Sequence, residues 1–256
     1  MWLFFHKLAS PKYFYSTASI LIPWLFFLGL SLMLFGIING LYFAPPDYQQ
    51  GDAFRIIYVH VPAAYLSMMI YVLMAITSII GLIWRIKLAH AVTVSAAPLG
   101  AWFTLLALMT GSIWGRPMWG TWWEWGDPRL TSELLMLFLY LGYIALRAAV
   151  PDNNKADKLS SILILIGAIN IPIIHFSVEW WTSLHQGSTL LKSGGPAIAT
   201  SMLYPLLAMI FGLTIYFGGL LLIRVKAEVL SLSLIHISEP TRPERIGFGG
   251  VGVEKK

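Results

Sequence analysis

Long apolar runs dominate the pattern of hydrophobic and polar positions along the chain. Six of them are long enough to cross a membrane as helices, because a hydrocarbon core about 30 Å thick needs roughly 20 apolar residues in helical form. They occupy about 18–42, 62–83, 91–113, 132–150, 159–178 and 198–223. The pattern therefore predicts an all-α integral membrane protein with six transmembrane helices, which form a single membrane domain over residues 1–228.

The second apolar run begins well before its predicted span. The pattern starts near Phe54 and continues to Trp84, which at about 1.5 Å per residue is too long to lie wholly in hydrocarbon. Pro62 suits the first position of a helix, because proline lacks an N–H that would be unpaired there anyway. We therefore expect His60 to lie at the entrance of this span, near the water interface.

Composition agrees with a membrane protein and excludes several kinds of site. Hydrophobic residues make up 57% of the chain and charged residues only 11%, against about 25% in a typical soluble protein. The chain has no cysteine, which excludes disulfides, thiolate metal sites, cysteine nucleophiles and covalent haem attachment through CxxCH. The sequence also has no phosphate-binding glycine loop, HExxH helix or nucleophile elbow, and no segment that predicts nucleic-acid binding.

The distribution of lysine and arginine predicts the orientation of the spans. The side that holds the N-terminus carries Lys7, Lys12, Arg85, Lys87, Arg147, Lys155, Lys158, Arg224 and Lys226, and the opposite side carries Arg55, Arg116, Arg129 and Lys192. Because positive residues concentrate on the cytoplasmic side, both termini are expected there. The longer connections at 43–61, 114–131 and 179–197 then face outward.

The outward connection at 114–131 is rich in tryptophan. It holds five of the eleven tryptophans of the chain: Trp114, Trp119, Trp122, Trp123 and Trp125. An aromatic belt usually places only one or two rings at a helix end. Five rings therefore favour a platform for a ligand, and an unusually large aromatic belt is the alternative. Trp119, Trp122 and Trp123 would share one face of a short helix, and such an aromatic surface suits a flat, apolar, anionic ligand.

Two histidines are expected on the same side of the membrane as these tryptophans. His60 closes the first outward connection and His185 lies in the third. Neutral imidazole suits iron, and haem is the flat cofactor that histidine ligates from above or below its plane. A helix cap or interface residue is the alternative for each histidine alone. His175, near the outer end of the fifth span, is either a rival ligand or a hydrogen-bonded histidine within the bundle.

Charged residues near the tryptophans complete the candidate site. Arg55, Arg116 and Arg129 are guanidinium groups available to pair with haem propionates, with lipid headgroup contact as the alternative. Asp127 precedes a proline, which predicts an N-cap at the start of the fourth span, and its carboxylate is also a candidate contact of the ligand. Glu133 and Glu179 are candidates for holding the tryptophan loop in place.

Three segments resemble a known family. "WGRPMWGTWWEWGDPRLTSELLMLFLYLGY" resembles the tryptophan-rich WWD signature of the haem-handling proteins of cytochrome c maturation. "NIPIIHFSVEWWTSLHQGST" and "YVHVPAAYLSM" resemble the other two outward segments of the haem exporter protein C family within that group. The similarity runs from the first span to about residue 226. The family has aspartate directly after tryptophan, whereas Gly126 intervenes here, and we expect a local turn to absorb it.

The resemblance implies a function and a set of partners. Family members are multi-pass proteins of the bacterial inner membrane that hold b-type haem, without a covalent bond, on the periplasmic side. His60 and His185 match the axial ligands of iron, and the tryptophan-rich segment contacts the porphyrin. Haem passes to the periplasmic chaperone, maturation protein E, and the one-span maturation protein D and the ABC-type maturation proteins A and B associate with the family. The resemblance implies a binding and transfer protein in contact with membrane lipid, not an enzyme.

Two other functions are compatible with the sequence. A permease subunit of an ABC-type exporter of haem or another small molecule would need a polar or interrupted path through the spans, for which Pro98, Pro172, His175 and Pro205 are candidates. A synthetase that attaches haem covalently is the third possibility, and 256 residues are few for that group of proteins.

The C-terminal segment is expected not to belong to the native protein. "LSLIHISEPTR", from Leu232 to Arg242, resembles the conceptual translation of a transposase adapter used in DNA library preparation. Residues 229–256 are therefore expected to be a non-native tail, and no functional prediction uses them.

Overall fold

The computed structural model describes residues 11–185, 187 and 198–238. Six helical segments in this part of the chain are long and apolar enough to cross a membrane, which confirms the all-α, six-span prediction. The principal helices are α2 (Pro11–Ile38), α3 (Ile57–Trp84), α4 (Lys87–Trp119), α5 (Pro128–Ala149), α6 (Asn153–Gly167), α7 (Asn170–Trp180) and α8 (Thr200–Ser238). Lys7, Lys192 and tail residues 239–256, which entered the sequence predictions, lie outside the described residues.

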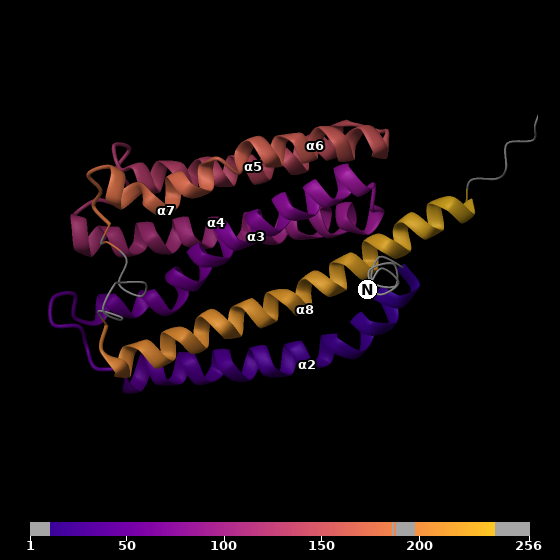
Figure 1. Ribbon diagram of the computed structural model, residues 1–256. Coiled ribbons are helices and arrows are strands. Elements are labelled where there is room, and N and C mark those ends of the chain that lie inside the picture. The colour runs from indigo at the N-terminus through magenta and orange to yellow at the C-terminus, as the bar shows by residue number, and fades with distance from the viewer. Residues whose placement is uncertain (1–10, 186, 188–197, 239–256) are drawn as a thin grey trace, which may run out of the picture.

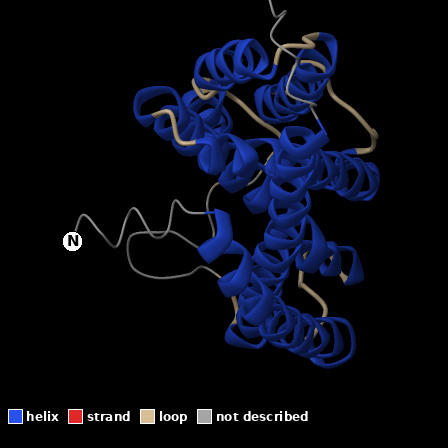
Figure 2. Cartoon of the chain, turned by 90° about the vertical axis from the view of Figure 1, so that its right-hand side faces the viewer, coloured by secondary structure: helices blue, strands red, loops and turns tan. Residues whose placement is uncertain are grey.

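The helices form two groups. The first and last helices, α2 and α8, lie side by side as a long pair, and α3 to α7 form the other group (Figure 1). Glycine permits the close approach of α2 and α8, since a Cβ on Gly29 would lie 2.9 Å from the backbone nitrogen of Tyr216. Small residues at such crossings are typical of helix packing in membranes. Figure 2 shows the bundle from one end, with helix as the only regular secondary structure in the described residues.

The main core lies where α3, α4 and α5 meet α6, α7 and α8. Apolar and tyrosine side chains fill this core, among them Leu66, Ile70, Met74, Ala96, Phe103, Met136, Tyr140, Ile164, Ile174 and Phe217. These contacts join the helices along the membrane-spanning part of the bundle, and the end of α4 and the start of α5, which flank the tryptophans, lie together at one end of it. We call this end the tryptophan end.

The start of the second span differs from the prediction. A 3-10 helix at Asp52–Ile56 leads directly into α3, which begins at Ile57, so Pro62 is not the first helical residue. The extra turn exists because the preceding 3-10 helix already supplies helical backbone before the proline. His60 consequently lies within α3, about one turn from its start.

The third span is longer than predicted, and the short tryptophan helix does not exist. Helix α4 continues through Trp114 and ends at Trp119, where Gly120 adopts a left-handed conformation (φ 79°) and its N–H donates to the carbonyl of Arg116. Such a glycine ends a helix because it adopts this conformation without a Cβ clash. Trp122 and Trp123 therefore lie in an irregular loop, and the prediction that they share a helical face with Trp119 was wrong.

The fifth span lies within Asn153–Trp180, which agrees with the predicted segment 159–178. Its helix has a local irregularity at Ala168 and Ile169, which keep right-handed helical dihedral angles between α6 and α7. Asn170, the first residue of α7, donates its side-chain amide to the carbonyl of Ser132 on α5 at 2.9 Å. This bond fixes α7 against the start of α5, close to the tryptophan end.

Candidate ligand-binding site at the tryptophan end

His60 projects from α3 onto one face of α4. Its Nδ1 lies 3.1 Å from the carbonyl oxygen of Ala107 and 3.0 Å from the hydroxyl of Thr110. A Cβ on Gly111 would lie 3.1 Å from His60 Cε1, so glycine leaves the room that the imidazole needs. Because a carbonyl only accepts, Nδ1 carries the proton and donates it to Ala107. The lone pair of Nε2 is then available to a metal.

His185 lies in the connection that follows α7. Its Nδ1 is 3.4 Å from Oδ1 of Asp127, and only 10% of its side chain is exposed. The hydroxyl of Ser183 lies 3.4 Å from the same ring nitrogen and accepts the backbone N–H of His185 at 3.1 Å. With Nδ1 directed at a carboxylate, Nε2 is again the nitrogen left for a ligand, an arrangement that orients metal-binding histidines.

Asp127 joins the start of α5 to the loop that carries His185. Its Oδ1 accepts the N–H groups of Arg129 and Leu130 at 3.0 Å each, which confirms the predicted N-cap. Its Oδ2 accepts the hydroxyl of Ser183 at 2.7 Å and the N–H of Leu184 at 2.8 Å. Only 2% of the residue is exposed. One buried carboxylate thus begins a helix and positions a histidine.

The electrostatics of this pair favour a charged aspartate beside a neutral histidine. Burial raises the pKa of Asp127, but hydrogen bonds from Leu130, Ser183 and Leu184 outweigh it and hold the pKa below its ordinary value. Burial lowers the pKa of His185, and the opposing effect of the Asp127 carboxylate does not cancel this. His185 is therefore neutral at pH 7, which is the form that binds metals.

Trp114 and Trp119 form one aromatic cluster with His185. The ring of Trp119 meets His185 edge to face at 4.8 Å between centroids and meets Trp114 in the same way at 5.1 Å. The indole N–H of Trp114 donates to the side-chain oxygen of Gln50 at 3.1 Å, which attaches the first connection to α4. The end of α4 thus brings all three connections of the tryptophan end together.

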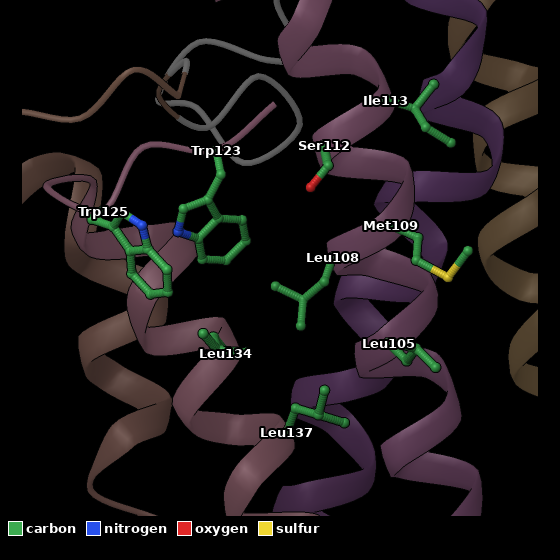
Figure 3. A pocket seen from close by; sticks show the side chains of 9 residues that line it. All are labelled: Leu105, Leu108, Met109, Ser112, Ile113, Trp123, Trp125, Leu134 and Leu137. Carbon is green, nitrogen blue, oxygen red and sulfur yellow. The ribbon is translucent and has the colours of Figure 1, made fainter. Parts of the chain in front are cut away.

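Trp123 and Trp125 belong to a different surface. Their rings lie 5.5 Å apart at one end of an apolar groove of about 500 Å³ between α4 and α5 (Figure 3). The rest of the groove is lined by Leu105, Leu108, Met109, Ser112, Ile113, Leu134 and Leu137. The α4 residues of the groove lie on the face opposite the one that contacts His60, because successive residues turn by about 100° in a helix. The five tryptophans therefore do not form one platform, and Trp122 is exposed.

A turn absorbs Gly126. The N–H of Asp127 donates to the carbonyl of Glu124 at 3.1 Å, and the N–H of Gly126 donates to the Glu124 carboxylate at 3.2 Å. The expectation of a local turn is confirmed. Because this turn lies between Trp125 and the N-cap, Asp127 can still begin α5.

The three arginines differ in what they contact. Arg129 donates to the carbonyl of His175 at 3.3 Å and acts electrostatically on both His60 and His185. Arg55 donates to the carbonyl of Gly40 at 2.7 Å and pairs with the carboxylate of its neighbour Asp52 at 2.9 Å. Arg116 donates to the carbonyl of Gly120 at the end of α4. Of the three arginines, Arg129 is the one that acts electrostatically on both histidines.

Two sequence predictions about neighbouring residues were wrong. His175 is exposed and its ring packs on Phe176 at 4.7 Å, so it is not a hydrogen-bonded side chain within the bundle. Only its carbonyl is engaged, because α7 turns this side chain away from α5. Glu133 does not hold the tryptophan loop, since it is 7% exposed and bonds to Ser67 on α3 at 2.6 Å. Glu179 is exposed at the end of α7.

Sequence reasoning missed the residues that orient the histidines. These residues are Ala107, Thr110, Gly111 and Ser183. Three of them are small side chains or backbone groups on α4 that meet His60 across nearly 50 positions of sequence. No local motif marks such residues, because their importance comes from helix packing alone.

Comparison of the sequence with known proteins shows the family to which the chain belongs. The family described as Heme exporter protein C matches residues 4–237. A protein named "Heme exporter protein C" from Haemophilus influenzae is 50% identical over 90% of this chain and 93% of its own length. The proteins of that name from Escherichia coli K12 and Bradyrhizobium diazoefficiens are 49% and 43% identical, over 95% and 94% of this chain and 95% and 93% of their own lengths. The chain therefore belongs to the Heme exporter protein C family, whose bacterial members it matches along almost all of its length.

Proposed function

We propose that this protein binds haem as its cargo between His60 and His185 and presents it to a protein acceptor outside the membrane. The observation that carries the proposal is the state of the two imidazoles. Each comes from a different element, each has Nδ1 directed at a protein acceptor, and each has Nε2 left for a metal. The name "Heme exporter protein C" of the relatives supports haem as the molecule that is bound.

The surrounding residues fit a haem. Neutral imidazole is an iron ligand, and two of them from different elements suit the two faces of a macrocycle. Trp114 and Trp119 supply apolar edges beside His185, and Arg129 supplies the cation that a propionate needs. In the proposal Trp122 and Arg55 make further contacts at the rim, and Asp127 acts through His185. Trp123 and Trp125 line the groove on the opposite face of α4 and do not contact this haem.

The membrane side of the site follows from the distribution of charge. The excess of lysine and arginine on the side of the N-terminus supports cytoplasmic termini and a periplasmic tryptophan end. We place the protein in the bacterial inner membrane as a multi-pass protein, with the haem site at the periplasmic face. Haem there is accessible to a periplasmic acceptor without passage through the bundle.

The proposed transfer is an exchange of iron ligands rather than a catalysed bond. Haem is held as b-type haem, without a covalent bond to the protein. His185 lies on a loop fixed chiefly by Asp127, whereas His60 lies within α3, so an acceptor would displace His185 first. The proposed acceptor is the haem chaperone, maturation protein E, with the one-span maturation protein D and the ABC-type maturation proteins A and B in the same assembly.

The visible absorption spectrum of detergent-purified protein tests the proposal. We expect a low-spin spectrum with two histidine ligands, which is lost or changed in His60→Ala and in His185→Ala. His90→Ala is the matched control, because His90 packs on Gly81 at the other end of the bundle. A protein that purifies without haem and does not take it up would contradict the proposal. Haem lost in His175→Ala but unchanged in His185→Ala would move the second ligand to His175.

One observation favours a permease subunit as the second candidate function. The helix of the fifth span is locally distorted between α6 and α7, and distorted or broken helices are found at the binding sites of transporters. Haem flux into vesicles that contain this chain alone would support the permease and contradict presentation at one face.

A further inference from the structure

Glu133 is a carboxyl group inside the bundle that the proposed iron site does not use. It lies on α5, four residues after Arg129, and is 7% exposed. An isolated carboxylate in a low-dielectric interior is unfavourable, so such a group is either neutral or paired with a cation. Which of these states Glu133 adopts determines whether Arg129 is free for another anion.

The hydrogen bonds around Ser67 indicate the neutral state. The Ser67 hydroxyl lies 2.6 Å from Oε1 of Glu133 and 2.8 Å from the carbonyl oxygen of Ala64. With an ionised Glu133, both of these oxygens would be acceptors, and serine has a single proton to share between them. With a proton on Glu133, the acid donates to Ser67 and Ser67 donates to Ala64. Both short contacts are then complete hydrogen bonds.

The groups that face Glu133 come from three helices. On α3, Ser67 is its hydrogen-bond partner, and Tyr71 packs on Tyr140 at 5.2 Å between ring centroids. On α5, the hydroxyl of Tyr140 donates to the carbonyl of Ser67 at 2.7 Å. On α7, the carbonyl of His175 accepts from Arg129, and the side chain of His175 is exposed. Arg129 is the cation that interacts with Glu133.

Arg129 therefore interacts with two carboxylates of the protein, Asp127 and Glu133, and a ligand carboxylate would be a third anionic partner. Glu133 is its i+4 neighbour on the same face of α5, a spacing at which opposite charges meet. A carboxylate of the bound ligand is the third partner, on the side of His60 and His185. Two carboxylates on one guanidinium repel each other, so ionisation of Glu133 competes with the ligand for Arg129.

We propose that Glu133 is a positioning residue that controls the affinity for haem through its proton. Neutral Glu133 leaves Arg129 free for a propionate, and ionised Glu133 pairs with Arg129 and weakens haem binding. The inference rests on the proposed function, in which Arg129 meets that propionate. Haem binding then takes up protons from solution to form the neutral acid, in an amount equal to the fraction of Glu133 that was ionised before binding, at most one per haem. Haem affinity must then fall as the pH rises.

Haem titrations of the detergent-purified protein from just below neutral to alkaline pH test this inference. We expect the affinity of the wild type to fall roughly tenfold as Glu133 ionises, which is within the usual range for two coupled sites. Glu133→Gln mimics the neutral acid and should bind haem with no such decline, and Glu133→Asp, which restores a titratable group, should recover it. Glu179→Gln is the matched control, because Glu179 is exposed on α7, and it should keep the decline of the wild type.

Infrared spectroscopy of the wild type supplies a measurement that needs no variant. The C=O band of a protonated carboxylic acid should disappear over the same pH range as the decline in affinity. A decline that persists unchanged in Glu133→Gln, or a wild-type protein without that band, would overturn the inference alone. A wild type that binds no haem at any pH would overturn the proposed function and this inference with it.

Discussion

The backbone N–H of Leu184 donates to Oδ2 of Asp127 at 2.8 Å, across 57 positions of sequence. The same carboxylate caps α5 through Oδ1, so the start of a membrane helix and the His185 loop depend on one side chain. The geometry of the second histidine is consequently set by a residue that need not touch the ligand.

Replacing Asp127 by alanine should weaken haem binding as well as stability. The change removes a helix cap, at about 1 kcal/mol. It also removes the part-buried hydrogen bond from the N–H of Leu184, at about 0.5–1.5 kcal/mol. Thermal unfolding and haem titration of the purified variant measure the two effects. Asp152→Ala is the matched control, because Asp152 caps α6 through Lys155 in the same way. Equal losses of haem affinity in the two variants would contradict the role of Asp127.

Gly111→Ala should impair the site and leave the fold intact. The added Cβ would lie 3.1 Å from His60 Cε1, so the imidazole has to move while α4 gains helix propensity of up to about 1 kcal/mol. We expect weaker haem binding and a changed spectrum, with no loss of thermal stability. Gly142→Ala is the matched control, since its Cβ would meet only Leu163 at an ordinary 3.8 Å. An unchanged spectrum in Gly111→Ala would show that His60 does not depend on this face of α4.

The six spans could be predicted because apolar length alone identifies a membrane helix. The buried face of each span could not be predicted, because a helix that is apolar all round has no apolar stripe that distinguishes its buried side. The contacts of His60 with Ala107 and Thr110 are of this kind, and they appear only when α3 and α4 pack together. Local sequence contains no trace of them.

The site shows the same division between local and distant causes. The cap made by Asp127 follows from two adjacent residues, aspartate and proline, and was predicted correctly. The bond from Asp127 to Leu184 joins two connections and was not predictable. The number of tryptophans identified the right region of the chain. It did not predict that they divide into two aromatic groups, because this division arises where Gly120 ends α4 between Trp119 and Trp122. One backbone conformation separates the two aromatic groups.

Trp119→Leu should weaken haem binding more than any change to a lipid-facing tryptophan. Trp119 makes edge-to-face contacts with both His185 and Trp114, each worth about 0.5–1.5 kcal/mol. Loss of both should reduce the affinity for haem by roughly tenfold, since about 1.4 kcal/mol corresponds to that factor. Trp102→Leu is the matched control on the same helix, because Trp102 is 60% exposed. Haem titration of the two variants measures the difference, and a similar small loss in both would contradict a role for Trp119.

Haem binding should weaken on acidification, once the pH falls below the ordinary pKa range of histidine. Burial lowers the pKa of His185 from its usual value near 6.5, so the folded protein keeps this ring neutral where an unfolded chain already binds a proton. The stability from this neutral histidine is therefore present at neutral pH and declines as the pH falls below about 6.5. Iron affinity declines only as the pH falls through the lower pKa of His185 in the folded protein. Because the Asp127 carboxylate raises the pKa of His185, Asp127→Asn should move the acid decline to lower pH while it weakens binding at pH 7. Haem titrations of wild type and variant between neutral and acidic pH measure both effects, and a decline that moves to higher pH in Asp127→Asn would contradict the pairing of Asp127 with His185.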